Sequence, residues 1–243
     1  MIYRARELQF SYGRPIGIIA LEERIPCPPG TPGNPSTFPF PVCYEVALGV
    51  SATALRHAPP EGLESFIAAG QRLVKRGAWA VAGNCGLMIV HQEALARALP
   101  VPVLLSSLLQ VPLIARMLAP DAAIGVLVSG ANSLNAEHLK LARAGTDARI
   151  VLANMQGKPC FTAAVCDEGG ELDFEGVTAE AVDVAQTLVR EHPEVKALLL
   201  ECVDLPPYAH AVQEAVGLPV FDITTLIGHF RSALVRNPFT GVY

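Results

Sequence analysis

The segment WAVAGNC, residues 79–85, and the segment ALLLEC, residues 197–202, share one design in the two halves of the chain. Each is a continuous apolar run that leads to a cysteine, and Cys85 and Cys202 lie 117 residues apart (202 − 85). Continuous rather than alternating apolar runs are typical of strands buried in a parallel sheet. The pattern therefore predicts two buried strands, each of which ends beside a thiol.

Further matches at the same offset extend the likeness between the halves. Pro102-Val103 corresponds to Pro219-Val220, and the hydroxyl group of Ser107 corresponds to that of Thr224. The first strands expected in each half, IGIIA at residues 16–20 and IGVLV at residues 124–128, are also alike. These matches indicate a duplicated structural unit with the order strand, connection, strand, cysteine, helix, strand.

Apolar residues at helical spacing, together with cap residues, predict the helices between these strands. We expect helices over about 61–76, 87–98, 108–118, 178–191, 207–216 and 225–235, and another that begins near Asn135. Alternating strands and helices are typical of parallel, doubly wound sheets with right-handed crossovers. We therefore expect an α/β protein of two pseudo-symmetric, flavodoxin-like domains with the active site in the cleft between them. Residues 1–106 plus 225–243 would form the first domain, with Cys85, and residues 107–224 the second, with Cys202.

Composition narrows the function. The chain has 243 residues, 51% of them hydrophobic and 17% charged, with a net charge of −5. It has no Lys/Arg-rich segment and no apolar run of about 18 residues, which argues against binding to nucleic acid and against a membrane span. The first residues also lack the apolar core of a signal peptide. We expect a cytoplasmic protein that acts on a small molecule, and the apolar content is compatible with a homodimer.

The six cysteines contain no Cys-x-x-Cys pair and no histidine at zinc-ligand spacing, so we expect no metal site. A chain of this length without a secretion signal is expected to keep free thiols. The shared offset distinguishes Cys85 and Cys202 from the other four, and Cys160 and Cys166 receive no role.

Residues 25–42, IPCPPGTPGNPSTFPFPV, form a segment of unusual composition. Its seven prolines exclude a regular helix or a central strand. We expect an ordered loop that either covers the cleft or packs at an edge of the sheet.

Thiols at strand ends are suited to catalysis because ligands bind at the carboxyl ends of parallel strands. A helix N-terminus at that place should lower the pKa of each thiol from about 8.5 toward neutrality. A base on one face of a carbon and an acid on the other invert its configuration, and Cys85 and Cys202 supply such a pair. The N–H groups of Gly86, Leu87 and Val203 are candidates to bind the enolate oxygens. The chain has no Gly-rich phosphate loop with a lysine, so we expect no cofactor.

Four polar residues lie near the cysteines, and each can have a functional or a structural role. Asn84 either directs its amide at a substrate carboxylate or satisfies a backbone group at the strand end. Ser129 either donates to a carboxylate or stabilises a turn. Asp204 either assists the neighbouring thiol or caps a helix. Glu201 either supports the neighbouring Cys202 or is simply exposed, and we favour a structural role.

The segments Asn84-Cys85-Gly86 and Leu200-Glu201-Cys202-Val203-Asp204-Leu205-Pro206-Pro207-Tyr208-Ala209 resemble the paired cysteine motifs of the aspartate/glutamate racemase superfamily. This superfamily also contains hydantoin racemases, arylmalonate decarboxylases and maleate isomerases. The resemblance covers most of the chain, and PGNPSTFPFPV is similar to a segment of a largely uncharacterised subgroup. It implies two similar α/β domains, a cleft between them and cofactor-independent chemistry beside a carboxylate or carbonyl group.

The chain departs from the superfamily at informative positions. Glutamate racemases typically have Cys-Asn-Thr and Cys-Thr-His, where this chain has Cys85-Gly86-Leu87 and Cys202-Val203-Asp204. Their first-strand Asp-Ser motif is replaced by Ala20-Leu21-Glu22-Glu23, so contacts to a substrate amino group must differ. Arylmalonate decarboxylases keep only the second cysteine, and the presence of both argues for proton transfer on two faces.

We therefore expect a cofactor-independent racemase or epimerase of a small carboxylate or carbonyl compound, amino acid or hydantoin-like, that works by 1,1-proton transfer between Cys85 and Cys202. Two alternatives stay open. One is a lyase or cis-trans isomerase of the same superfamily that uses one cysteine as nucleophile or proton donor. The other is a two-lobed small-molecule binding protein without turnover.

Overall fold

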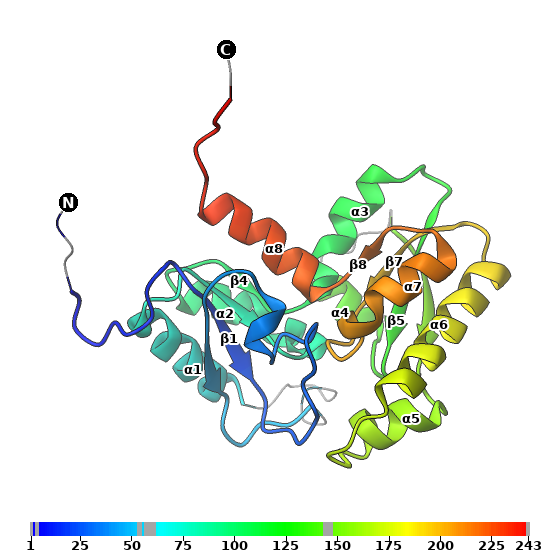
Figure 1. Cartoon of the computed structure of the whole chain (residues 1–243), viewed down its shortest axis with the longest axis horizontal. Helices are drawn as coiled ribbons and strands as arrows, with labels where there is room; N and C mark the ends of the chain where they lie inside the picture. The colour runs from blue at the N-terminus through cyan, green and yellow to red at the C-terminus, as the bar shows by residue number, and fades with distance from the viewer. Residues whose placement is uncertain (1, 3–4, 53–54, 56–61, 143–147, 242–243) are drawn as a thin grey trace.

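The computed structural model describes residues 2, 5–52, 55, 62–142 and 148–241 (Figure 1). Within these residues, the strands form two parallel sheets of four strands each. The first sheet has the order β2-β1-β3-β4 and consists of β1 (Ile16–Ala20), β2 (Val42–Val46), β3 (Ala80–Gly83) and β4 (Val103–Leu104). The second has the order β6-β5-β7-β8 and consists of β5 (Ala123–Val128), β6 (Arg149–Asn154), β7 (Val195–Leu200) and β8 (Val220–Phe221).

The identical strand order confirms the expected pair of doubly wound units. In the first sheet β1 and β3 are neighbours, with Ile19 opposite Gly83. In the second sheet β5 and β7 are neighbours, with Leu127 opposite Leu200. Because parallel neighbours end at the same edge, the residues that follow β1 and β3, and those that follow β5 and β7, come together at one end of each sheet.

Helices cover both faces of the first sheet. α1 (Leu63–Arg76) and α2 (Gln92–Ala98) pack on one face, and α8 (Ile223–Leu234) packs on the other. The strand side chains alternate accordingly, since Ile19 faces α1 while Ile16 and Ile18 face α8. The last helix of the chain therefore returns to the first sheet.

The second sheet is covered in the same way. α6 (Phe174–Glu191) and α7 (Ala209–Val216) pack on one face, and α3 (Val111–Met117) and α4 (Ala136–Leu141) pack on the other. Asn135 caps α4 as expected, because its side chain accepts hydrogen bonds from two N–H groups of the first helical turn. α6 begins earlier than the expected residue 178 because Asp173 caps it, with its carboxylate 2.9 Å from the Gly176 nitrogen. Across the described residues, we find no helix with the length and apolar character needed to cross a bilayer.

Strand β2 is an element that the sequence did not predict. It pairs with β1 at the edge of the first sheet, with Cys43 opposite Gly17. Cys43 is the one buried residue of the strand, so the sequence VCYEV lacks the apolar run that marks the inner strands. Its position directly after the prolines also obscured it.

We call the first sheet with its covering helices the first lobe and the second sheet with its helices the second lobe. The proline loop, residues 25–42, is ordered and extends from the first lobe to the second. Its shape is held by an internal hydrogen bond from Thr37 Oγ1 to the Thr31 carbonyl (2.6 Å), and Tyr44 of β2 ties it to the sheet by donating to the Pro32 carbonyl (3.1 Å). Gly30 has φ +109°, and a Cβ atom there would lie 2.6 Å from the Cα of Pro207. Only a residue without a side chain fits this contact, so the proline loop packs directly on the chain that follows Cys202.

Candidate active site

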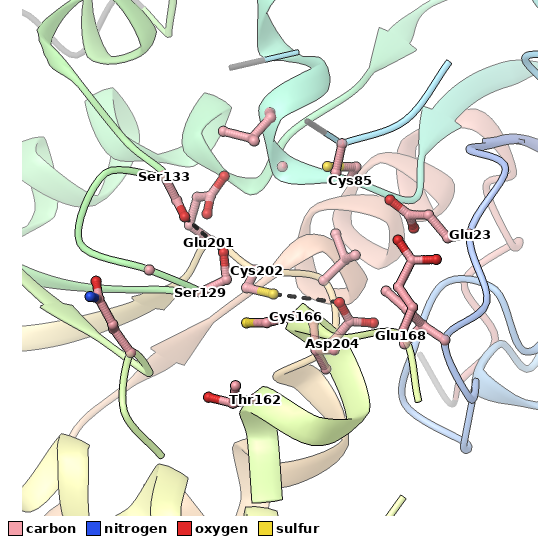
Figure 2. Close-up of a pocket in the computed structure, with 18 of the residues that line it drawn as sticks. Glu23, Cys85, Ser129, Ser133, Thr162, Cys166, Glu168, Glu201, Cys202 and Asp204 are labelled. Carbon is pink, nitrogen blue, oxygen red and sulfur yellow. Dashed lines mark hydrogen bonds between the residues drawn. The ribbon is translucent and has the colours of Figure 1, made fainter. Parts of the chain in front are cut away.

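A cavity of about 600 Å³ lies where the carboxyl ends of the two sheets face each other (Figure 2). Its volume suits a small organic ligand. All of the site residues expected from the sequence line this one cavity. They are Asn84, Cys85, Gly86, Leu87, Ser129, Cys202, Val203 and Asp204.

Cys85 lies two residues after β3 and begins the 3-10 helix η3 (Gly86–His91) in an extended conformation. The preceding residue fastens this strand end to its neighbour. Asn84 donates its N–H to the Ile19 carbonyl (3.0 Å), and its side-chain oxygen accepts the N–H of Leu21 (3.0 Å). Asn84 thus has the structural role considered for it, and it also lines the cavity.

Gly86 lies in close contact with the strand end of the other lobe. A Cβ atom at Gly86 would lie 2.2 Å from the Oε1 of Glu201 and 2.5 Å from its carbonyl oxygen. Glu201 is 2% exposed and is held by its N–H, which donates to the Leu127 carbonyl (2.9 Å). The two lobes therefore meet beside the cavity at a point that has no room for a larger residue.

Replacing Gly86 by Ala should destabilise the protein by about 2 kcal/mol, because the added methyl group overlaps buried atoms of Glu201. Urea unfolding would measure the change. Gly228→Ala is the matched control, since a Cβ atom there meets nothing within 4 Å inside helix α8. The control should be neutral or stabilising, because alanine is the better helix former. Equal stabilities of the two variants would contradict the close contact.

Cys202 lies two residues after β7 and is 8% exposed, while still lining the cavity. Its thiol donates a hydrogen bond to the Oδ2 of Asp204 at 3.6 Å, which Figure 2 marks with a dashed line. The next 3-10 helix, η6 (Pro206–Tyr208), has Leu205 as its cap residue and no side-chain cap. The capping interpretation of Asp204 is therefore wrong, and the residue contacts the thiol.

The expected lowering of the thiol pKa values is also wrong. Burial raises the pKa of Cys85 well above its usual value, and the carboxyl groups of Glu23 and Glu201 add to the rise. Burial likewise raises the pKa of Cys202, with further contributions from Asp204 and Glu201. The backbone N–H groups near each sulfur offset only part of this, because the helices that follow are short. Either thiol would ionise more readily if a positive charge entered the cavity.

Two carboxyl groups of the cavity were not expected from the sequence. Glu23 follows β1 and Glu168 lies in the segment before α6, and both line the cavity with Asp204 and Glu201. Burial, with Asp204 and Glu168 close by, raises the pKa of Glu23 to about 8. Burial raises the pKa of Asp204 to about 6. The pair Glu22-Glu23 after the first strand was the available signal, but the sequence alone does not tell which of them faces inward.

The four carboxyl groups give the cavity a strongly acidic character. Among its described lining residues there is no lysine or arginine. Carboxyl groups that lie close together repel one another and favour a ligand that carries positive charge. The cavity therefore complements a cation better than a second anion.

The opposite wall carries neutral hydrogen-bonding groups. The hydroxyl groups of Ser129 and Ser133 lie 2.9 Å apart, and Asn132 and Gln156 lie along the same wall. Figure 2 shows the two serines on one side, Glu23 and Glu168 on the other, and Cys202 between them. Ser129 thus bridges a turn that is also closed by the N–H of Ser133, which donates to the Gly130 carbonyl (3.0 Å), in agreement with the turn interpretation. The same wall offers neutral donors to a carboxylate.

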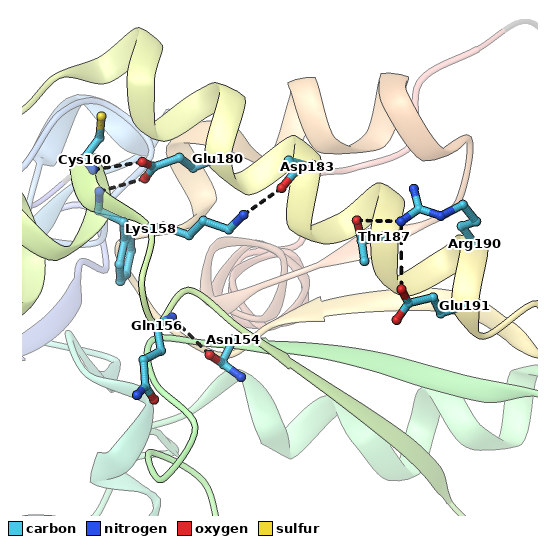
Figure 3. Close-up of polar contacts among 10 residues, drawn as sticks. Asn154, Gln156, Lys158, Cys160, Glu180, Asp183, Thr187, Arg190 and Glu191 are labelled. Carbon is cyan, nitrogen blue, oxygen red and sulfur yellow. Dashed lines mark hydrogen bonds and ion pairs between the residues drawn. The ribbon is translucent and has the colours of Figure 1, made fainter.

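A third thiol, that of Cys166, lines the cavity at the end of the π-helix η5 (Thr162–Cys166). No role was expected for this cysteine from the sequence. The short helix α5 (Pro159–Phe161) before it is anchored on α6. The two oxygens of Glu180 accept the N–H groups of Cys160 and Phe161 at 2.9 Å each, as Figure 3 shows for this region. Lys158 also forms an ion pair with Asp183 (2.6 Å). These contacts position the wall that contains Thr162 and Cys166.

Relatives are found by sequence comparison, although no family model matches the chain. A dimethylsulfoniopropionate lyase of Durusdinium sp. clade D is 31% identical over 234 residues, which cover 93% of this chain and 77% of that protein. Dimethylsulfoniopropionate lyase 5 of Emiliania huxleyi (strain CCMP1516) is 31% identical over 237 residues. The match covers 93% of this chain but only 47% of that longer protein.

Solved structures with the same fold are more distant in sequence. Unliganded arylmalonate decarboxylase has a TM-score of 0.58 and 18% identity, over 90% of this chain and 91% of that one. An aspartate racemase homologue from Pyrococcus horikoshii OT3 has a TM-score of 0.58 and 17% identity, over 91% and 99%. These solved structures share the two-domain α/β fold that the superfamily resemblance implied, and the lyases supply the sequence relationship. The chain belongs to the family of the dimethylsulfoniopropionate lyases.

Proposed function

We propose that the protein is a lyase that eliminates a neutral group from a small carboxylate bearing a positive charge, with dimethylsulfoniopropionate as its substrate. The observation that carries the proposal is the combination of three thiols and four carboxyl groups in a cavity whose described lining has no lysine or arginine. The names of the relatives support it. The lyase alternative is therefore favoured over the racemase expected from the sequence.

Charge distinguishes the candidate substrates. A dicarboxylate such as an arylmalonate, or an amino acid with an acidic side chain, would bring excess negative charge to the four carboxyl groups of the cavity. A sulfonium group instead offsets that charge, and it makes ionisation of a nearby thiol more favourable. The raised thiol pKa values thus fit a substrate that brings its own cation.

The reaction needs a base at the carbon beside the carboxylate. A Cys85 thiolate takes the proton from Cα and becomes a thiol, and the C–H electron pair forms the Cα=Cβ double bond. The bond between Cβ and sulfur breaks, and its electron pair leaves with sulfur as neutral dimethyl sulfide. Acrylate remains. Since the sulfide leaves uncharged, no acid is required to protonate it.

The neighbours of the thiols favour Cys85 as the base. The pKa of about 8 keeps Glu23 mostly neutral at pH 7, so Cys85 ionises beside an uncharged carboxyl group. The pKa of about 6 leaves Asp204 mostly ionised, and its carboxylate accepts a hydrogen bond from the Cys202 thiol. Cys202 therefore stays protonated. Its S–H, turned from Asp204 to the substrate, would then stabilise the negative charge that develops toward the substrate carboxylate, together with the N–H groups of Gly86 and Leu87.

Incubation with dimethylsulfoniopropionate should release dimethyl sulfide and acrylate in equal amounts, as measured by gas chromatography and by NMR. The preference for a cation is tested with two inhibitors of equal shape, 3-(trimethylammonio)propionate and the neutral carbon analogue 4,4-dimethylpentanoate. The cation should bind at least about tenfold more tightly, a difference of about 1.4 kcal/mol. Equal inhibition constants, with no sulfide released, would refute the proposal.

Racemisation is the second candidate, because both thiols line the same cavity. Its first step is the same, and it differs in that a second thiol returns a proton instead of a group leaving. Amino acids and hydantoins incubated with the protein in D2O would gain deuterium at Cα faster than in a protein-free control if this activity exists. Deuterium exchange without any elimination product would make the racemase the better assignment.

A further inference from the structure

Elimination from a sulfonium compound differs from racemisation in its proton balance. In racemisation one thiol loses a proton while the other gains one, so no proton leaves the cavity. In elimination each turnover leaves one proton on the base and none is returned to the product. A thiol that acts as the base must therefore lose this proton before the next turnover, and the cavity must contain a group that accepts it.

Glu23 lies in the place from which such a group can reach Cys85. It follows β1, whose neighbour β3 leads to Cys85, and the two strand ends are fastened together by Asn84. Of the charged groups near Cys85, Glu23 has the largest influence on its protonation. In Figure 2 the carboxyl group of Glu23 lies on the same side of the cavity as Cys85.

The adjacent residue shows that this orientation is specific. Glu22 is exposed and directs its carboxylate away from the cavity, where it accepts the N–H of Gly49 at 2.7 Å. Its own N–H donates to the Val50 carbonyl (3.4 Å). These contacts fix Glu22 toward the loop after β2, so Glu23 is the member of the pair that lines the cavity.

Several titratable groups also surround Glu23 and influence its protonation. Asp204 from the loop after β7 and Glu168 from the second lobe face it, and the thiols of Cys85 and Cys27 lie within its electrostatic reach. Glu168 in turn accepts the backbone N–H of Arg24 (3.1 Å) across the cleft. Glu23 is half-buried, in contrast to the deeply buried Glu201, and can exchange a proton with solvent.

We propose that Glu23 is the proton partner of Cys85, through which the thiol loses the proton that each elimination leaves on it. This role rests on the proposed lyase activity. After the neutral products leave, Cys85 carries the abstracted proton and Glu23 is mostly neutral. When the next sulfonium substrate binds, its positive charge favours the ionised forms of both groups. Glu23 then releases its own proton to solvent and accepts the proton of the Cys85 sulfur, which forms the thiolate beside an uncharged carboxyl group.

The pairing is tested without substrate by iodoacetamide alkylation of Cys85 as a function of pH, followed by peptide mass spectrometry. In the parent protein, ionisation of Glu23 above about pH 8, its pKa, places a negative charge beside the thiol. Glu23→Gln removes that charge, so the midpoint pH of Cys85 alkylation should fall by about one unit. Glu23→Asp keeps a carboxyl group and should stay near the parent midpoint, and Glu22→Gln is the matched control that should not shift.

The turnover number should fall in Glu23→Gln, although alkylation of Cys85 becomes easier. Glu23→Gln makes Cys85 easier to alkylate, yet it should lower kcat at saturating dimethylsulfoniopropionate by about tenfold or more, because the thiol loses its proton acceptor. Added imidazole, a small proton acceptor, should restore part of kcat in Glu23→Gln and have no effect on Glu22→Gln. A general loss of structure would not produce faster alkylation together with slower, rescuable turnover.

Each outcome tests a separate part of the proposal. Identical alkylation midpoints in Glu23→Gln and Glu22→Gln would overturn the pairing, whatever the substrate. A shifted midpoint with unchanged kcat would overturn the role of Glu23 in proton exit. If the parent protein does not eliminate dimethyl sulfide at all, the proposed lyase function fails, and the alkylation midpoints alone still decide whether Glu23 and Cys85 are coupled.

Discussion

Replacement of Cys85 by Ala is expected to lower kcat for elimination by about a thousandfold or more, because no other group would take the Cα proton. Replacement of Cys202 by Ala should cost about a hundredfold, since it removes one hydrogen-bond donor that stabilises the developing charge and leaves Asp204 without its thiol partner. Dimethyl sulfide release at saturating substrate measures both effects.

Cys160→Ala is the matched control for these variants. Cys160 is also a free thiol, but it lies outside the cavity, where its sulfur donates to Asp173 at 3.6 Å. Its replacement should leave kcat close to that of the parent protein. If both cavity variants kept full activity, neither thiol would take part in the reaction. If only Cys202→Ala were inactive, the base would be Cys202 and the roles of the two thiols would have to be exchanged.

Phe161→Ala is expected to lower the free energy of unfolding by about 4 kcal/mol, because it leaves a large void beneath the cavity wall formed by η5. Phe161 has no exposed surface and packs in the core of the second lobe. Urea unfolding followed by circular dichroism measures the loss. Phe239→Ala, at a phenylalanine that is 93% exposed, is the control and should change stability by less than about 0.5 kcal/mol.

A second readout connects this core residue with the site. Amide hydrogen exchange should become faster over η5, since Phe161 and the Glu180 contacts hold this segment in place. KM for the substrate should rise as well, because Thr162 and Cys166 line the cavity. A Phe161→Ala protein as stable as the Phe239→Ala control would show that the core does not depend on this ring.

The inner strands could be predicted from the sequence because they are buried on both faces. Ile16, Val81, Ile124 and Leu199 all lie in continuous apolar runs, and short runs of this kind are typical of strands inside a parallel sheet. The edge strand β2 could not be predicted, since an edge strand contacts the core with few residues and its sequence need not be apolar. The early start of α6 depended on the cap residue Asp173, which lies in a polar stretch with several possible caps.

The site was predictable where residues are fixed by strand ends and not where they come from loops. Cys85 and Cys202 each lie two residues after a strand of equivalent position, so their convergence follows from the duplication. Glu168 comes from an irregular segment, and its place in the cavity depends on the path of a loop with no repeating pattern. The pKa of each thiol also depends on burial and on neighbours distant in the sequence, which explains why a nearby helix start was a poor guide.

The contact between Gly30 and Pro207 has a consequence for how the ligand is received. Because the proline loop of the first lobe packs on the second lobe, the two lobes are joined beside the cavity as well as by the segments of chain that connect them. The conformational entropy of bringing the thiols into one site is thus lost during folding rather than at each encounter with a ligand. Affinity then depends on the match between ligand and preorganised walls, and a mutation that loosens the seat at Gly30 would weaken binding without touching any group that contacts the ligand.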